Sequence, residues 1–197
     1  MAFLPAPLYQ GGMSTKPRRT TYRHGNLREA ALKAASRLVA KDGHESLSLR
    51  EVAEAVGVAH RSLYNHFEHR EALLDAVATD AYTRLAALLV KARTPADYTA
   101  IYVRFALAHP KIYALMTSRP HATMKHNPPL QRAVHKVITE AMRIFCRDIE
   151  TPAERRRAVM KVYITLYGGI SLYAAGVLDQ PNEKALIAEL AAMNAGM

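Results

Sequence analysis

Apolar residues along this chain of 197 residues recur mostly at intervals of three and four positions. This spacing places side chains on one face of an α-helix. Glycines and prolines separate the periodic segments, and no series of alternating strands with regular turn signals is present. The pattern predicts an all-α protein, with helices at about residues 27–41, 49–56, 59–67, 70–92, 95–109, 110–117, 129–150, 152–178 and 183–194.

Residues 46–73 contain two short predicted helices joined by a tight turn. Ser48 is a good N-cap for the first of them, and Glu51, three residues later, can complete a capping box. Gly57 tolerates the positive φ that a sharp turn requires. In the second helix Leu63 and Phe67 lie four residues apart and face the core, which leaves a polar side for contacts outside the protein. The stretch therefore predicts a helix-turn-helix, with the helix at 27–41 as the third helix of the unit.

The same stretch resembles the DNA-binding domain of TetR-type (tetracycline-repressor-like) transcriptional regulators. The matching segments are Ser48-Leu-Arg-Glu-Val-Ala53, Gly57-Val58, Leu63-Tyr64-Asn65-His66-Phe67 and Arg70-Glu-Ala-Leu73. The chain departs from the family pattern at three positions. Family members often have Ser or Thr where Ala59 stands, a small residue or proline where Arg61 stands, and Lys where Arg70 stands. These departures leave the fold unaffected, but they prevent a prediction of the operator sequence by analogy.

The resemblance implies a role in DNA binding for nine residues of this unit. The residues expected to hold phosphates are Tyr64, His66 and Arg70. Those expected to face base edges are His60, Arg61, Ser62 and Asn65, while Ser48 and Arg50 would approach the DNA backbone from the first helix of the pair. Arg61 is the best candidate for reading a guanine, because a guanidinium matches its two major-groove acceptors. The alternative is that these side chains form the solvated face of a structural helical hairpin.

The chain divides into three predicted parts: a flexible basic arm at residues 1–22, a helix-turn-helix DNA-binding domain at 23–70, and a helical ligand-binding and dimerisation domain at 71–197. The cations that precede the first acid, Glu29, are Lys16, Arg18, Arg19, Arg23 and Arg28. The arm either follows the DNA beside the helix-turn-helix or is a solvated tail. It lacks the regions of a signal peptide, and Met13 is an alternative start to Met1.

Two segments of the third part, residues 102–116 and 163–172, resemble a C-terminal subclass of the same family. That subclass usually has Trp and His where Tyr163 and Tyr167 stand. The resemblance implies an effector-binding and dimerisation domain. Its candidate effector-binding residues combine aromatic rings, hydroxyls and thioethers, which suit a small, partly apolar ligand; they are Tyr98, Tyr102, Phe105, His109, Met116, Met142, Tyr163 and Tyr167. The alternative is that these side chains form an ordinary helical core.

The last two predicted helices, at about 152–178 and 183–194, are expected to pair with their copies in a four-helix homodimer interface. Residues 162–178 carry no charge, but they are short for a membrane span and contain polar residues and three glycines. We therefore expect a buried helix and no membrane partner. Gly168 and Gly169 predict a close neighbour, either a partner subunit or a ligand, because glycine otherwise destabilises a helix.

No catalytic, metal or cofactor site is predicted. His60, His66 and His69 are six and three residues apart, which does not place them on one helical face. The single cysteine, Cys146, excludes an internal disulfide and is typical of a protein from a reducing cytoplasm. No nucleophile with a neighbouring base and no phosphate-binding glycine loop is evident. The formal charge of +10 is spread along the chain and favours polyanionic partners.

The sequence therefore predicts a cytoplasmic DNA-binding transcriptional regulator that is not an enzyme. It would be a homodimeric, ligand-responsive repressor of a palindromic operator. The alternative is a helical small-molecule-binding or protein-interaction module without DNA-binding function. The sequence identifies neither the effector nor the operator and its genes, and it does not decide between repression and activation.

Overall fold

The computed structural model describes residues 27–120 and 124–195. The regular structure in these two ranges is helical, without strands, which confirms the all-α prediction. The helices are α1 (Leu27–Asp42), α2 (Leu49–Ala55), α3 (His60–Tyr64), α4 (Arg70–Leu89), α5 (Pro95–Ala108), α6 (Pro110–Thr117), α8 (Pro128–Phe145), α9 (Pro152–Ala174) and α10 (Glu183–Ala195). The predicted basic arm, residues 1–22, lies outside the described residues.

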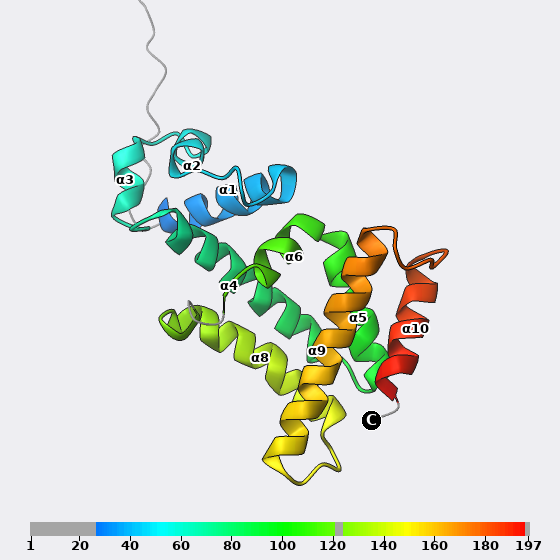
Figure 1. Cartoon of the computed structure of the whole chain (residues 1–197). Coiled ribbons are helices and arrows are strands. Elements are labelled where there is room, and N and C mark those ends of the chain that lie inside the picture. The colour runs from blue at the N-terminus through cyan, green and yellow to red at the C-terminus, as the bar shows by residue number, and fades with distance from the viewer. Residues whose placement is uncertain (1–26, 121–123, 196–197) are drawn as a thin grey trace, which may run out of the picture.

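Helices α1, α2 and α3 form a group at one end of the molecule, and α4 runs from this group into the remaining helices (Figure 1). α4 packs most extensively against α8 and also contacts α1, α5 and α6. Its side chains Leu74, Val77 and Leu85 are fully buried. One continuous hydrophobic core therefore extends from the helix-turn-helix into the larger group of helices, with α4 as the shared element.

Helix α10 packs on α5 and α9, and Gly169 of α9 allows one of these contacts to be close. A Cβ atom added to Gly169 would lie 2.3 Å from Cδ2 of the buried Leu190, whereas Gly168 faces open space. The close neighbour that the glycine pair predicts is thus α10 of the same chain at Gly169, rather than a partner subunit or a ligand. Gly168 still lacks a neighbour within the chain.

Four helices end earlier than their apolar pattern predicts: α3 at Tyr64 and α4 at Leu89, each about three residues early, and α9 and α8 by slightly more. α9 ends at Ala174 rather than near residue 178, because Gly176 turns the chain with φ +69°. The Gly176 N–H donates to the Tyr173 carbonyl and the Val177 N–H donates to the Leu172 carbonyl, which are the two bonds of a Schellman motif. α8 ends at Phe145 rather than near residue 150, because Cys146 leaves the helical conformation with φ −119° and ψ 27°. Residues 147–150 then connect it to the proline-initiated start of α9.

No helix within 27–120 and 124–195 combines the length and the hydropathy that crossing a membrane requires. The uncharged run at 162–178 is divided between α9 and the turn after it. α9 buries Val162, Leu166 and Ile170 against the rest of the protein. It is therefore buried on one side only.

Candidate nucleic-acid interface

Local bonds shape the helix-turn-helix as the sequence predicts. The Ser48 hydroxyl accepts the Glu51 N–H at 3.2 Å, and a Glu51 carboxylate oxygen accepts the Ser48 N–H at 2.9 Å, which completes the capping box of α2. Gly57 adopts φ +71° in the turn. The Val58 N–H then donates to the Ala53 carbonyl at 3.0 Å. These bonds determine the path of the chain from α2 into α3.

Helix α3 has five residues, of which Leu63 is buried. A helix of this length is not stable by itself, so it depends on Leu63 and the following buried Phe67 to hold it against α1 and α2. The His60 and Tyr64 rings meet edge to face on its outer side, with centroids 5.1 Å apart. The side chains that α3 and its C-cap expose to solvent are His60, Arg61, Tyr64 and Asn65, with Ser62 and His66 half-buried beside them.

Arg70, which the sequence predicts to hold a phosphate, is engaged inside the protein. Its Nε donates to the Leu47 carbonyl at 2.7 Å, and its Nη2 donates to the Glu45 carbonyl at 3.0 Å and to the His44 carbonyl. Its Nη1 pairs with a Glu71 carboxylate oxygen at 2.5 Å. The guanidinium ties the start of α4 to the loop between α1 and α2. This geometry favours a bracing role over a phosphate contact, because most of the donors are occupied.

The two predicted backbone contacts on α2 differ in their surroundings. The Ser48 hydroxyl also donates to Glu51 at 2.9 Å, so it acts chiefly as the cap of α2. Arg50, in the first turn of α2, is exposed. Arg28, which the sequence grouped with the cations of the arm, lies at the start of α1 with its guanidinium 5.4 Å from the centre of the Phe67 ring. It therefore adds a positive charge close to the end of α3.

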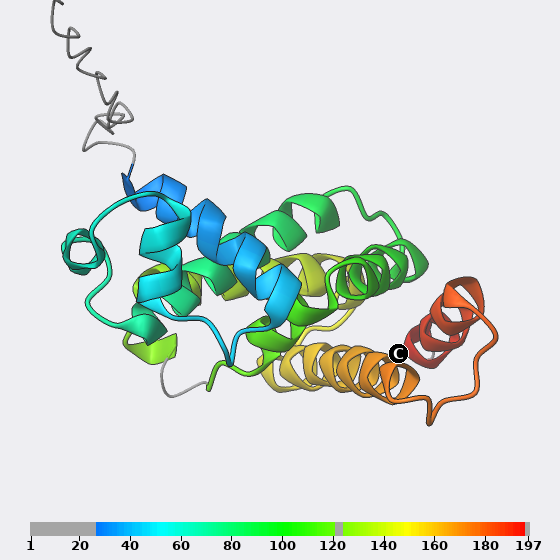
Figure 2. The same cartoon turned by 90° about the horizontal axis from the view of Figure 1, so that it is seen from above.

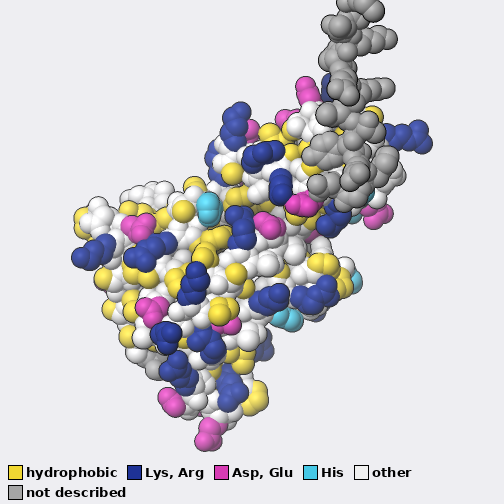
Figure 3. Space-filling view, turned by 180° about the vertical axis from the view of Figure 1, so that it is seen from behind, with side chains coloured by type: hydrophobic (Ala, Val, Ile, Leu, Met, Phe, Trp, Pro, Cys, Tyr) yellow, Lys and Arg dark blue, Asp and Glu magenta, His cyan; other side chains and the backbone are white. Residues whose placement is uncertain are grey.

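Positive charge outside the helix-turn-helix does not form a single site on the face seen from behind. Lysine and arginine side chains are spread over that face and alternate with acidic and apolar ones (Figure 3). On this face, therefore, positive charge does not gather into one candidate site. The chemistry and the exposure of α3, more than the net charge, mark the candidate interface.

Six tyrosines from four helices form what we call the tyrosine cluster: Tyr82 of α4, Tyr98 and Tyr102 of α5, Tyr113 of α6, and Tyr163 and Tyr167 of α9. The Tyr102 and Tyr113 rings meet edge to face at 6.1 Å, and the Tyr98 and Tyr102 rings stack at 6.2 Å. The predicted effector residues contain four of the six. The other two are Tyr82 and Tyr113. The sequence places Tyr113 in the same interior as the effector candidates and assigns Tyr82 to the apolar side of its helix, since a ligand-facing tyrosine at helical spacing cannot be distinguished from a core residue.

Burial raises the pKa of Tyr102 well above its ordinary value, and the neighbouring Tyr113 and Tyr82 hydroxyls add to this effect. The Tyr102 hydroxyl therefore stays neutral at physiological pH. The Tyr82 hydroxyl donates to the Met116 carbonyl at 2.9 Å. The Tyr113 hydroxyl is buried without a well-formed hydrogen bond. Burial raises its pKa, and the nearby Tyr102 hydroxyl offsets only part of this increase. The Thr99 hydroxyl is buried without a partner among the described residues.

The predicted effector residues do not all face one enclosed site. The buried ones are Tyr98, Tyr102, Phe105 and Met116. Tyr163 and Tyr167 are 44% and 43% exposed, and their stacked rings are 5.9 Å apart. His109 is exposed beside Phe105, with ring centroids 5.3 Å apart. Met142 belongs to the exposed side of α8, so the structure separates it from the buried part of the set.

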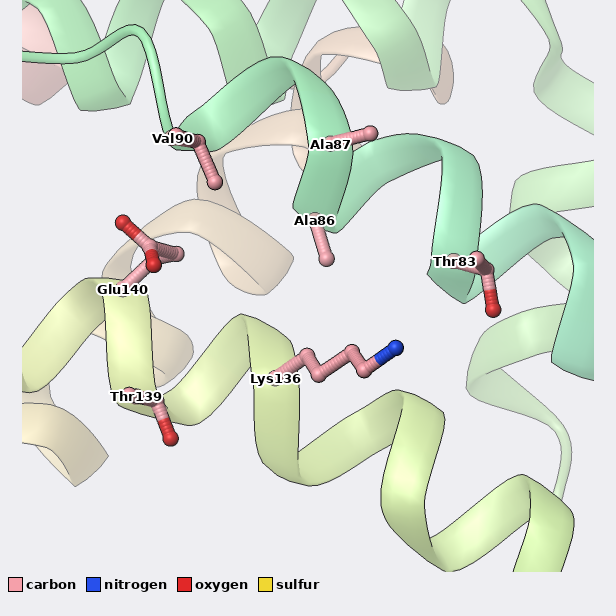
Figure 4. Close-up of a pocket in the computed structure, with 7 residues that line it drawn as sticks. All are labelled: Thr83, Ala86, Ala87, Val90, Lys136, Thr139 and Glu140. Atoms are coloured by element: carbon pink, nitrogen blue, oxygen red, sulfur yellow. The ribbon is translucent and has the colours of Figure 1, made fainter.

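A cleft of about 260 Å³ lies elsewhere, between α4 and α8 (Figure 4). Ala86 points from α4 toward α8, and the Lys136 side chain lies between the two helices. The remaining lining residues are Thr83, Ala87, Val90, Thr139 and Glu140. None of the predicted effector residues lines this cleft. The sequence contains no signal for it, because it arises from the packing of two helices about 50 residues apart along the chain.

Helix α9 exposes apolar side chains on the side that its own chain leaves uncovered. Met160, Ile164 and Leu172 are 46%, 61% and 46% exposed, and Gly168 lies between them at the same four-residue spacing. A hollow of about 580 Å³ runs along the first half of this side, lined by α9 residues that include Met160 and Ile164. α9 follows an outer edge of the molecule (Figure 2). Such a surface is typical of a protein contact.

The described residues contain no group of three or more His, Cys, Asp or Glu side chains that could hold a metal ion. Cys146 is buried, and burial raises the pKa of its thiol. Its Sγ lies 3.7 Å from the Arg155 carbonyl. A thiol in this state is a poor nucleophile, which agrees with a structural role.

Two protein-family models match the chain. The model for bacterial regulatory proteins of the tetR family matches residues 31–77, and the model for the tetracyclin repressor-like C-terminal domain matches residues 96–193. Among curated proteins, tetracycline repressor protein class C from Escherichia coli is 45% identical over 51 residues. This match covers 26% of the chain and only 23% of the length of that repressor.

Solved structures resemble most of the chain. A protein of unknown function from Rhodococcus sp. RHA1 is 31% identical, with a TM-score of 0.73, and the match covers 91% of this chain and 99% of that one. The structure of RolR in complex with the ligand resorcinol has a TM-score of 0.60 at 21% identity, and the match covers 88% of both chains. At 21% identity, the similarity to RolR shows only that the two proteins share a fold.

Proposed function

The chain belongs to the TetR family of bacterial regulatory proteins, and from this premise we propose that it is a homodimeric, ligand-responsive repressor of a palindromic operator. Family members are DNA-binding transcriptional regulators without catalytic activity, so this chain is a transcriptional regulator and not an enzyme. Its dimeric state, its response to a ligand and its operator are parts of the proposal. We place its action in the bacterial cytoplasm, where its DNA would be.

The observation that carries the proposal is the exposed polar side of α3. One buried leucine anchors this short helix, and its remaining side chains are hydrogen-bonding groups, of which His60, Arg61 and Tyr64 are exposed and Ser62 is half-buried. In this proposal α3 enters the major groove, with His60, Arg61, Ser62 and Asn65 facing base edges. Tyr64, His66 and Arg50 hold the phosphates, and Ser48 supports α2 from the cap.

The test is a selection of sheared genomic DNA by the purified protein, followed by affinity measurements on the enriched fragment and on a scrambled copy at several salt concentrations. We expect the enriched fragment to contain an inverted repeat and to bind at least about a thousandfold more tightly than the scrambled copy. Equal affinity for both DNAs would contradict operator recognition and favour the alternative, a helical binding module without DNA-binding function.

A second copy of the chain is the proposed partner of the bare side of α9, together with α10. An isologous four-helix contact needs two apolar helix surfaces per subunit. α9 supplies Met160, Ile164 and Leu172, and α10 supplies Met193, which is 53% exposed. Gly168, with open space around it, lets the partner helix approach closely. This contact would place two α3 helices on one DNA.

The proposed effector is a small neutral molecule with an aromatic part and one or two hydrogen-bonding groups. Its site would be the tyrosine cluster, which would open when the ligand enters. Support comes from the buried Thr99 and Tyr113 hydroxyls, because a buried polar group without a good partner is costly until a ligand satisfies it. The resorcinol bound by RolR is one compound of this type.

A panel of neutral phenols, with resorcinol first, can be screened for release of the protein from the selected DNA. Tyr113→Phe keeps the ring and removes the hydroxyl, so we expect it to bind DNA like the wild type and to need about tenfold more of an active phenol. Phe105→Trp, which fills the same interior, should also impair release and spare DNA binding. Loss of operator affinity together with the response would show that these side chains are only core.

A further inference from the structure

Four charged side chains connect the helix-turn-helix to the helices beyond α4; we call Arg70, Glu71, Asp75 and Arg119 the charged relay. At the DNA-binding end, Arg70 contacts the loop before α2 and pairs with one oxygen of Glu71 at 2.5 Å. The other Glu71 oxygen accepts a hydrogen bond from Nη1 of Arg119 at 2.7 Å. The same nitrogen lies 3.3 Å from Asp75 Oδ1. Glu71 and Asp75 are one helical turn apart on α4 and share Arg119 between them.

Asp75 links the relay to α8 as well. Its second oxygen, Oδ2, accepts Nδ2 of Asn127 at 3.1 Å. The side-chain oxygen of Asn127 caps α8 by accepting the Leu130 N–H at 3.2 Å. Arg119 follows the last residue of α6 by two positions, and Asn127 immediately precedes α8. A single carboxylate on α4 therefore holds the end of α6 and the start of α8 in place.

The centre of the relay is buried, and this favours a geometric role over a stabilising one. The Arg119 and Asp75 side chains are only 9% and 8% exposed. The Arg119 Nε is buried without a hydrogen-bond partner among the described residues. A buried ion pair with an unsatisfied donor contributes little net stability, because desolvation offsets the attraction between the charges. Its charged hydrogen bonds nevertheless require one arrangement of the groups they join.

Helix α6 contacts α1 of the DNA-binding unit near its start and the first turns of α4 just beyond its end. Near its start, the Lys111 ammonium donates to the Lys41 carbonyl in the last turn of α1, and beyond its end Arg119 reaches α4. Between these two points, α6 carries Tyr113 of the tyrosine cluster and the Met116 carbonyl that accepts the Tyr82 hydroxyl. α6 is thus held between the interior of the larger group of helices and the DNA-binding unit.

We infer that Arg119 is a positioning residue for DNA binding: through Glu71 and Asp75 it sets the orientation of the helix-turn-helix relative to α6 and α8. In a dimer this orientation determines the distance between the two α3 helices, so the intact relay favours one spacing of operator half-sites. A movement of α6 that separates Arg119 from α4 removes the constraint. The inference rests on the proposed homodimeric, operator-binding function.

The experiment compares three DNAs derived from the selected operator: both half-sites at the natural spacing, both with one base pair inserted between them, and one half-site alone. Arg119→Met keeps the length of the side chain and removes its charge. Arg104→Met is the matched control, because it removes the same charge and the 3.3 Å pair with Glu183 between α5 and α10, away from the DNA-binding unit.

We expect Arg119→Met to bind the natural operator about tenfold more weakly, which is within the range found for residues that couple two parts of a protein. Its affinity for a single half-site should be unchanged, and the inserted base pair should cost it less than it costs the wild type. Arg119→Lys should restore most of the affinity. Arg104→Met should equal the wild type on all three DNAs.

Wild-type affinity of Arg119→Met for the natural operator would overturn the inference, as would an equal loss on the single half-site. If the wild type itself does not distinguish operator from scrambled DNA, the proposed function fails instead of the relay. Should Arg119→Met not fold, as judged by its circular dichroism and melting curve, Glu71→Gln takes its place in the same comparison. Glu71 is half-exposed, and its replacement leaves the buried Asp75 paired with Arg119, so no buried carboxylate loses its partner.

Discussion

Helices α3 and α9 both present side chains that the described chain leaves uncovered, but the chemistry of the two surfaces is opposite. α3 has five residues and exposes groups that donate or accept hydrogen bonds, such as Arg61 and Asn65. α9 has 23 residues and exposes Met160 and Ile164 next to an open glycine. The first surface suits base edges and phosphates, and the second suits another apolar surface. Exposure alone therefore does not identify a partner; the groups that are exposed do.

The largest effect is expected where the apolar surface of α9 is given a charge. Ile164→Glu should convert the dimer into a monomer, because each subunit would bury an unpaired carboxylate at a cost of about 3–5 kcal/mol. Light scattering across a range of protein concentrations measures this. Val90→Glu is the control, since Val90 is 62% exposed and Ile164 is 61% exposed. If Val90→Glu dissociates the dimer and Ile164→Glu does not, the interface lies at the α4–α8 cleft instead of on α9.

Arg70 and Arg50 are expected to have different roles: Arg70 stabilises the fold, whereas Arg50 contacts DNA. Replacing each of them tests this difference. Arg70→Met removes charged hydrogen bonds to the loop before α2, so it should lower the free energy of unfolding by about 2–3 kcal/mol in a denaturant titration. Arg50→Met should change stability by less than about 0.5 kcal/mol and reduce the salt slope of DNA binding by about one phosphate contact. An unchanged stability of Arg70→Met, with a reduced salt slope, would restore the phosphate role predicted from the sequence.

Arg61 tests whether α3 reads bases. Arg61→Ala should weaken operator binding by about 1–3 kcal/mol for each recognition helix and flatten the preference at one base pair per half-site, since a bidentate contact to guanine would be lost. Fluorescence anisotropy on operator variants and scrambled DNA gives both quantities. An equal loss on operator and scrambled DNA would make Arg61 a phosphate contact and leave base recognition to His60, Ser62 and Asn65.

Gly169 lies on the side of α9 that α10 covers, and Gly168 lies on the uncovered side. Replacing each glycine by alanine therefore compares the same change in two different surroundings. Gly169→Ala should lower the free energy of unfolding by about 1–2 kcal/mol, because the new methyl group meets the buried Leu190. Gly168→Ala meets nothing within the chain and should leave the subunit as stable or stabilise it by up to about 1 kcal/mol. The two melting curves, recorded at equal dimer occupancy, check this. Equal destabilisation by both changes would show that Gly168 is also closely packed.

The smallest effect concerns pH. The hydrogen bond from Arg119 is the main cause that lowers the pKa of Glu71 below 4.5, against a smaller opposing effect of burial. A lowered folded-state pKa contributes stability that is present above about pH 4.5 and is lost as the pH falls through the lowered pKa. Glu71→Gln should therefore cost less than about 1 kcal/mol at neutral pH, since the side chain is half-exposed. The cost should disappear in unfolding titrations at lower pH, and a cost that stayed the same at every pH would contradict this role of the Arg119–Glu71 pair.

The parts of the protein that the sequence predicts correctly depend on residues that are neighbours along the chain. The helical period, the capping box between Ser48 and Glu51 and the turn at Gly57 each involve at most a few consecutive residues. The polar side of α3 follows from the same local pattern once Leu63 and Phe67 are assigned to the core. Such signals are visible in the sequence because the backbone links the groups that interact.

Contacts between residues that are far apart along the chain could be identified only from the tertiary structure. The sequence around Arg70 predicts an exposed side chain, as it does for Arg61. In the folded chain, however, the Arg70 guanidinium reaches backbone carbonyls 23 to 26 residues away. Arg119 meets Glu71 across 48 positions, and Gly169 meets Leu190. Periodicity states which side of a helix is apolar and cannot state which helix covers it, because that depends on how all side chains fill the core together. For this reason the sequence alone could predict that α3 faces DNA, whereas the charged relay became visible only in the folded chain.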